Sequence, residues 1–227
     1  MATGPLNKLF LFDIDGTLLR GAGPQHAAAL VAAIRQVLGA ETSLDGIPVH
    51  GMLDRDILRD MLRAGGFDEA HINAALPAIV AAAQELYPPT CPDISAKVLP
   101  GVREVLSEIR ALGFPIGLVT GNLTRIGWTK MERAGLREFF SFGAFSDMGP
   151  TRGDLARIAV ELAGVPGCSV TMIGDAPSDV AAAKSNGFRS VSVATGVTPR
   201  ETLAALQPDL LLNDLSQPED RRALIGD

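Results

Sequence analysis

The sequence predicts an α/β protein with a parallel sheet, into which an all-helical segment is inserted early in the chain. Residues 9–12 are four large apolar residues in a row, which is typical of a strand covered on both faces. Between residues 21 and 95 the apolar positions follow helical spacing instead. Beyond this segment helices and strands alternate, and such alternation requires right-handed crossovers and a parallel sheet. We therefore expect a core domain of residues 1–20 and 96–227 and a helical cap domain of residues 21–95.

Three helices are expected in the inserted segment, after a chain break at residues 21–24. The first follows His26, with apolar residues at helical spacing up to position 38. The second starts at Asp54, a suitable N-cap residue with an apolar stripe behind it. The third runs from Asp68 towards residue 87, and Pro77 should kink or divide it. A proline-rich return then leads back to the core.

The second half of the chain is expected to alternate regularly. The expected elements are a helix over 102–112, a strand over 116–120, a helix at about 123–134, a short strand near 141–145, a helix at 153–163 and a strand at 170–173. A further helix has Pro177 in its first turn and ends at Asn186-Gly187. Residues 190–194 and 209–212 are the last two expected strands. All of these strands would lie in one parallel sheet.

The first strand ends in two carboxylates, Asp13 and Asp15. Ligands of parallel α/β sheets bind just beyond the carboxyl ends of the strands. Successive strand side chains point to opposite faces, so both carboxylates reach one ligand only if the chain turns between them, which Gly16 permits. Two carboxylates so close repel each other, so a cation is implied. Taken alone, these residues would also suit an ordinary cap and turn.

Three further polar clusters follow apolar runs, and with them a family resemblance becomes visible. The clusters are Thr120-Gly121-Asn122, Arg152 after a short loop, and Gly174 to Asp179. The chain resembles the haloacid dehalogenase superfamily in its phosphatase branch, close to phosphoglycolate phosphatases and β-phosphoglucomutase-like proteins. Residues 13–17, 120–122 and 174–179 match the first, second and fourth motifs of that superfamily. The resemblance spans nearly the whole chain and implies a Rossmann-like core with a helical cap.

For a phosphate ester, Asp13 is expected to be the nucleophile that forms an aspartyl phosphate. The resemblance implies that Asp15 is the general acid and then the general base, with its side chain turned away from the metal. Mg²⁺ prefers hard oxygen ligands, and Asp13 and Asp175 are the best side-chain candidates. The family pattern adds the backbone carbonyl of Asp15 as a ligand and lets Asp179 orient the first shell. Asp179 would also suit a solvated first-turn residue of a helix.

Phosphate binding is assigned to Thr120, Gly121, Asn122 and Arg152. The first three lie where a strand ends and a helix begins, so their hydroxyl and amide groups can donate to phosphoryl oxygens, although Thr120 also suits a simple N-cap. The family normally supplies a lysine as its third motif, and here Arg152 is the best-placed cation. Its planar fork binds phosphate well but is not interchangeable with lysine.

Substrate choice is expected to lie with the cap, where Gly51, Asp54 and Arg55 resemble in position the specificity loop of helical-cap phosphatases. An equally open interpretation is that Asp54 caps the helix and Arg55 is solvated. His26 and His71 are expected to be surface residues of helices rather than ligands.

The sequence thus predicts a Mg²⁺-dependent phosphatase of a small phosphorylated metabolite, with phosphoglycolate as the leading candidate. A phosphomutase and a non-catalytic module that accepts or binds a phosphoryl group are the alternatives; a dehalogenase would not need Asp15. The net charge of −6 argues against a nucleic-acid or anionic-membrane partner. The lack of any apolar run of transmembrane length leads us to expect a cytoplasmic protein. The oligomeric state is left open.

Overall fold

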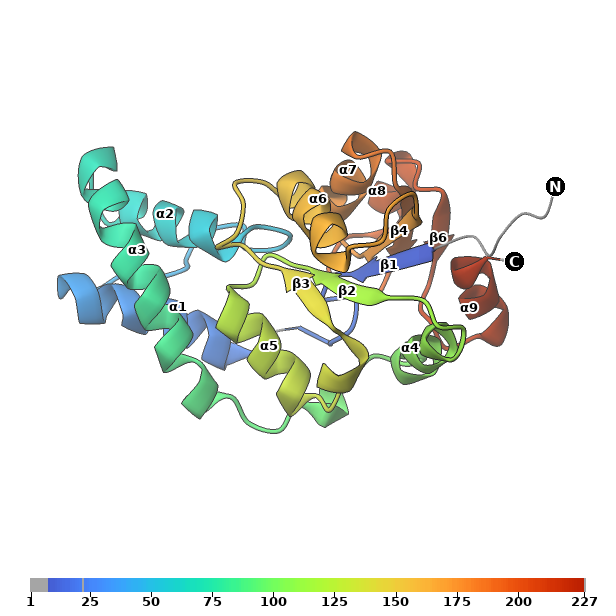
Figure 1. The fold of residues 1–227 in the computed structure, drawn as a ribbon. Coiled ribbons are helices and arrows are strands. Elements are labelled where there is room, and N and C mark those ends of the chain that lie inside the picture. Colours follow the sequence, from blue (N-terminus) through green and yellow to red (C-terminus); the bar gives the residue numbers. More distant parts are fainter. Residues whose placement is uncertain (1–7, 22, 227) are drawn as a thin grey trace.

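The computed structural model describes residues 8–21 and 23–226 and contains a six-stranded parallel sheet (Figure 1). Its strands are β1 (Lys8–Phe12), β2 (Ile116–Val119), β3 (Phe142–Ala144), β4 (Ser169–Gly174), β5 (Arg189–Val193) and β6 (Leu210–Leu212). Residues 1–7 and 227 of the predicted core and residue 22 of the predicted insertion lie outside this description. The predicted α/β class with a parallel sheet is confirmed.

The strand order β3-β2-β1-β4-β5-β6 places β1 in the middle, paired with β2 on one side and β4 on the other. Phe12 is in register with Leu118 and with Ile173. The residues that follow these three strands therefore emerge side by side at one edge of the sheet. The strand order also changes direction at β1, which is where doubly wound sheets bind their ligands.

Helices cover both faces of the sheet, with α4, α5 and α9 on one side and α6, α7 and α8 on the other (Figure 1). Their bounds are α4 (Val102–Ala111), α5 (Thr124–Arg133), α6 (Arg152–Ala163), α7 (Pro177–Ser185), α8 (Arg200–Ala205) and α9 (Pro218–Ile225). Strand β1 supplies a side chain alternately to each face: Phe10 and Phe12 join one apolar core, and Leu9 and Leu11 join the other. This two-sided burial explains the continuous apolar run in the sequence.

Three helices between β1 and α4 form the inserted segment at the end of the molecule away from the termini (Figure 1). They are α1 (Pro24–Leu38), α2 (Asp54–Ala64) and α3 (Glu69–Leu86), and α3 packs against both of the others. Asp68 caps α3 by accepting the His71 amide at 2.9 Å. Pro77 does not divide α3, which is one continuous helix. Among the described residues, the secondary-structure elements between β1 and α4 are all helices.

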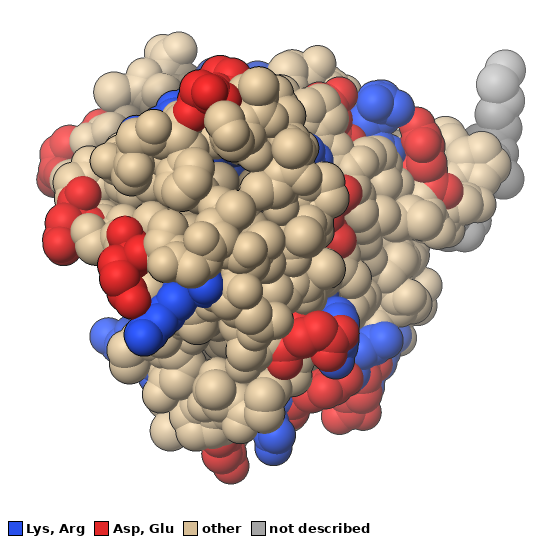
Figure 2. Space-filling view, turned by 90° about the vertical axis from the view of Figure 1, so that its left-hand side faces the viewer, with Lys and Arg blue, Asp and Glu red and all other residues tan. Residues whose placement is uncertain are grey.

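Short 3₁₀ turns complete the chain: η1 (Pro88–Thr90) and η2 (Ser95–Lys97) lead back from α3, and η3 (Arg137–Phe139) precedes β3. Among the residues described, no helix is both long and apolar enough to cross a membrane. Seen from the insertion end, the surface carries Lys and Arg interspersed with Asp and Glu over a mainly uncharged background (Figure 2).

Candidate active site

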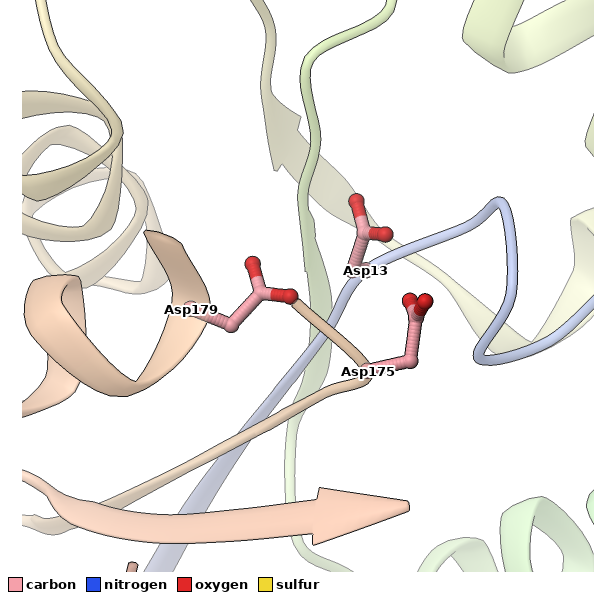
Figure 3. Close-up of side chains that lie close together, drawn as sticks. All are labelled: Asp13, Asp175 and Asp179. Atoms are coloured by element: carbon pink, nitrogen blue, oxygen red, sulfur yellow. The ribbon is translucent and has the colours of Figure 1, made fainter. Parts of the chain in front are cut away.

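Three buried carboxylates meet at the carboxyl edge of the sheet (Figure 3). Asp13 follows β1, Asp175 follows β4, and Asp179 lies in the first turn of α7. One oxygen of each carboxylate lies within 4.8 Å of the others. The adjacency of β1 and β4 in the sheet brings together residues that are about three quarters of the chain apart.

Two glycines make room for this cluster. A Cβ on Gly16 would lie 2.3 Å from Asp175 Oδ2, and one on Gly196 would lie 1.7 Å from the same atom. Gly16 also has a φ of +93°, which side-chain-bearing residues rarely adopt. The Thr17 hydroxyl donates to Asp175 Oδ1 at 3.1 Å, so the turn after β1 both admits and orients Asp175.

The cluster carries more negative charge than its surroundings neutralise. Burial, together with the Asp13 and Asp179 carboxylates, raises the pKa of Asp175 to about 8. Burial also raises the pKa of Asp179 to about 7, against the opposing effect of Arg152. Within the described residues, Asp175 Oδ2 and Asp179 Oδ1 are buried without a hydrogen-bond partner. Hard oxygen atoms in this state fit a divalent ion such as Mg²⁺.

These pKa shifts predict a pH-dependent response of stability to magnesium. Without metal, the raised pKa values mean that the folded chain binds protons at Asp175 and Asp179 more tightly than the unfolded chain does. Stability from these groups is therefore highest at low pH and falls as the pH rises from about 4 to about 8. Mg²⁺ needs the ionised carboxylates, so the rise in Tm that it causes should be larger at about pH 8.5 than at about pH 5.5.

Thermal unfolding with Mg²⁺ and with EDTA at both pH values checks this expectation. Asp175→Asn should remove most of the difference between the two pH values. A magnesium effect of equal size at both would contradict the assignment of these carboxylates as the metal site.

Arg152 is the cation of the cluster. It is the first residue of α6, and its buried guanidinium donates from Nη1 to Asp13 Oδ1 at 2.8 Å. Its Nε lies 3.5 Å from Asp179 Oδ1. Although burial opposes it, the charge of Asp179 and Asp13 raises the pKa of Arg152 further above its usual value. Arg152 thus contacts two of the three carboxylates, and one of them is Asp13, the predicted nucleophile.

Asp15 lies apart from the three carboxylates and has different partners. Its Oδ2 accepts hydrogen bonds from Asn122 Nδ2 at 2.8 Å and from Lys130 Nζ at 2.5 Å. Burial alone would raise its pKa, but the charges of Lys130 and His26 and these hydrogen bonds outweigh burial and lower the pKa of Asp15. The Asp15 carboxylate is therefore ionised at neutral pH.

Lys130 is a site residue that the sequence did not reveal. It belongs to α5, its side chain has no exposed surface, and its Nζ contacts Asp15, Asn122 Oδ1 at 2.6 Å and His26 Nδ1 at 3.3 Å. Lysine in a helix normally lies on the solvated face. The available signal was spacing: Lys130 is four residues from each of Ile126 and Ala134, and both of these are buried.

His26 contradicts the expectation of a surface residue, because its side chain is only 12% exposed. Its Nε2 lies 3.0 Å from Asp54 Oδ2, while its ring packs edge-on against Tyr87. His71, by contrast, is 74% exposed, as expected. His26 lines the site because the fold brings α2 and the end of α3 beside it, which sequence distance does not show.

Asp54 joins the inserted segment to the core. It is the first residue of α2, but its carboxylate does not cap that helix; it accepts the Leu123 amide of the core at 2.8 Å. The Asp54 amide in turn donates to Gly121 O at 2.7 Å. A Cβ on Gly121 would lie 2.1 Å from Met52 O, so the two backbones are in close approach there.

The predicted phosphate-binding loop lies between β2 and α5. Thr120 is fully buried, and its Oγ1 accepts from Asn122 Nδ2 at 2.8 Å. The N-cap position of α5 is occupied by Leu123, so Thr120 does not cap this helix. The Asn122 side chain forms hydrogen bonds with Thr120, Asp15 and Lys130, and it thereby links the loop to Asp15.

A cavity of about 660 Å³ lies over these groups, between core and insertion. Its lining includes most of the residues singled out from the sequence: Asp13, Asp15, Thr120, Gly121, Asn122, Arg152, Asp175, Gly51 and Asp54. Arg55 lies outside the lining. His50 belongs to it, with Nε2 3.0 Å from Thr198 Oγ1 and 3.4 Å from Asp175 Oδ2. Burial lowers the pKa of His50.

The structure thus combines a doubly wound sheet, a carboxylate cluster at its switch point and a helical insertion over it, and comparison with known proteins identifies this arrangement as that of a hydrolase. Residues 7–187 match the family model described as haloacid dehalogenase-like hydrolase. The chain is 30% identical over 223 positions to a phosphoglycolate phosphatase of Pseudomonas syringae, covering 93% of this chain and 78% of the relative. It is 32% identical over 203 positions to one of Caulobacter vibrioides, covering 86% and 83%.

Solved structures show the same fold. A protein from Clostridium acetobutylicum described as a predicted phosphatase superposes with a TM-score of 0.71 at 20% identity, over 97% of this chain and 99% of that one. A β-phosphoglucomutase from Clostridium difficile gives a TM-score of 0.69 at 18% identity, with the same coverage. The chain belongs to the haloacid dehalogenase-like hydrolase family, in which it stands with the phosphatases.

Proposed function

We propose that this chain hydrolyses a small phosphomonoester in a Mg²⁺-dependent reaction through an aspartyl phosphate on Asp13, with residues 21–95 acting as the cap. The observation that carries the proposal is the environment of Asp13. Its carboxylate faces the cavity, is paired with Arg152 at 2.8 Å, and lies beside two carboxylates that each have a buried oxygen without a hydrogen-bond partner. Relatives named phosphoglycolate phosphatase make phosphoglycolate the first compound to try.

In the first half of the reaction, a carboxylate oxygen of Asp13 forms a bond to phosphorus while the bond from phosphorus to the leaving oxygen breaks. Arg152 neutralises Asp13 and the phosphoryl oxygens, and the Gly121 and Asn122 amides donate to those oxygens. The leaving alkoxide takes its proton from Asp15. Because Asp15 is ionised in the free protein, it must first gain that proton, and the negative charge of the incoming ester raises its pKa in the required direction.

In the second half, water attacks phosphorus of the aspartyl phosphate, Asp15 accepts the proton of that water, and inorganic phosphate leaves with Asp13 restored. Asp13, Asp175 and the Asp15 carbonyl would hold Mg²⁺, with Asp179 orienting its waters. The ion, when bound, neutralises charge on the phosphoryl oxygens. Lys130 and Asn122 keep the Asp15 side chain on the side away from this cluster.

A phosphate-release assay with phosphoglycolate and a panel of phosphorylated metabolites, in Mg²⁺ and in EDTA, tests the proposal. We expect release that is lost on chelation and restored by added Mg²⁺. Interconversion of sugar phosphates without phosphate release would identify a phosphomutase instead. A phosphorylated protein that does not turn over would identify a phosphoryl-accepting module. Release that is unaffected by chelation would overturn the metal assignment.

A further inference from the structure

Apolar residues of the insertion form one part of the cavity lining, beside the polar His26, His50 and Asp54. We call this part the apolar wall; it consists of Ala27, Leu30, Leu44, Ile47, Val49 and Ile57, from α1, α2 and the loop between them. The polar lining residues of the core lie around Asp13, where phosphate chemistry is proposed. The cavity therefore offers a charged end for a phosphoryl group and an apolar surface for the rest of the ligand.

The size of the cavity exceeds what a two-carbon phosphate needs. Pockets of ~300–1,000 Å³ in proteins accommodate drug-sized molecules, and the volume here is about 660 Å³. A small acid ester would leave accessible residues of the apolar wall, such as Leu44, Ile47 and Val49, in contact with water, at a cost in free energy that a larger apolar ligand would remove. The volume and the lining of the cavity thus both favour a leaving group larger than that of a two-carbon phosphate ester.

The charges of the lining do not favour a carboxylate next to the phosphoryl group. Arg152 is paired with Asp13, and His26 is paired with Asp54. His50 contacts Thr198 and Asp175. Arg20, the other basic side chain among the described lining residues, is exposed to solvent. Apart from Arg20, the basic side chains of the described lining are thus already engaged, which leaves a short anionic leaving group poorly matched.

The rim of the cavity is apolar as well. Val49 of the insertion and Val197 of the core both line the cavity, and they are 45% and 74% exposed. The His50–Thr198 hydrogen bond joins the two loops that carry these valines. An apolar ligand that extends from Asp13 along the apolar wall would cover surface at this rim that is otherwise exposed.

We propose that the substrate is the phosphate monoester of an alcohol with an extended apolar body, alkyl or aryl, held on the apolar wall with its phosphoryl group at Asp13. This inference rests on the proposed phosphatase function and names the substrate class of the same site. Each methylene buried on the wall should strengthen binding about three- to fourfold.

Non-hydrolysable phosphonates test the proposal without relying on turnover. Calorimetric titration of the full chain with Mg²⁺ should show affinity rising along methyl-, butyl- and hexylphosphonate, and phosphonoacetate should bind more weakly than butylphosphonate. Affinity that does not change with chain length, or tightest binding of phosphonoacetate, would overturn the inference. Phosphate release from polar esters alongside flat phosphonate affinities would leave the phosphatase proposal intact, whereas release from no ester at all would remove that proposal.

Variants locate the binding surface. Ile47→Asn, in a half-buried loop position of the apolar wall, should weaken hexylphosphonate binding about tenfold and leave methylphosphonate binding unchanged. Val49→Asn, at an exposed position, gives the same test with no demand on the core. Leu38→Asn, 37% exposed at the end of α1 and outside the lining, is the matched control and should change neither affinity. Equal weakening of both ligands by Ile47→Asn and Val49→Asn would contradict the proposal.

Discussion

Asp13→Asn is expected to abolish phosphate release, with a loss of turnover of about 10⁴-fold or more. An amide oxygen is a poor nucleophile, while the amide has nearly the same shape as the carboxylate and can still accept the Arg152 hydrogen bond. The fold should be retained. Asp13→Asn loses a charge of the buried pair with Arg152 but also relieves the repulsion of Asp175 and Asp179, so we expect the metal-free variant to stay close in stability to the parent chain.

Phosphate release and thermal unfolding in EDTA check these two expectations together, and intact-mass analysis after rapid quenching looks for the phosphorylated protein. Asp45→Asn makes the same chemical change at an exposed position outside the cavity lining and should be neutral. Retention of activity in Asp13→Asn would refute the nucleophile assignment. If activity is lost, calorimetric binding of methylphosphonate distinguishes a folded, inactive variant from an unfolded one, because only a folded variant can bind it.

Lys130→Met is expected to lower both stability and turnover. Removing one partner of a buried ion pair typically costs ~3–5 kcal/mol. Lys130 is fully buried but the Asp15 side chain is 27% exposed, so we expect a smaller cost of about 2 kcal/mol. Turnover should fall about 100-fold, because Asp15 loses the partner that holds it in place and keeps it ionised for the attack by water.

A double-mutant cycle separates these effects. Lys130→Met combined with Asp15→Asn should regain part of the lost stability, since no unpaired charge is left, but should regain no turnover. Lys184→Met, on the exposed side of α7, is the matched control for loss of a lysine. Wild-type Tm and kcat in Lys130→Met would show that the buried pair has no role in either property.

Local sequence signals were sufficient for the sheet but not for every helix. Strand β1 is a continuous apolar run that ends before Asp13, and β4 contains a mainly apolar run before Gly174, so both could be located from residues 9–12 and 170–173. Helices α8 and α9 were not anticipated, because six or eight residues show too little periodicity; α9 buries only Arg221 and Leu224. Helix α3 continues through Pro77 and packs against α1 and α2, and such tertiary packing is not a local property of the sequence.

The candidate site likewise contains residues that local sequence signals identified and residues that they did not. Asp13, Thr120 and Asp175 could be placed because each directly follows a strand, and parallel strands end at one edge. Lys130 and His26 could not, because their burial depends on partners far away in the chain: Asp15 is 115 residues from Lys130, and Asp54 is 28 residues from His26. A charged side chain is assigned to solvent by default, and only tertiary contacts reverse that assignment.

The hydrogen bond from the Asp54 amide to Gly121 O also gives the insertion a thermodynamic role. The loop that would bind a phosphoryl group and the first turn of α2 share this bond, so a separation of the two would break it. An anion that binds residues 120–122 more tightly in one position of the insertion stabilises that position by the same coupling free energy, and the converse also holds. A substitution in α2 that never touches a ligand can therefore change how tightly inorganic phosphate binds to the core.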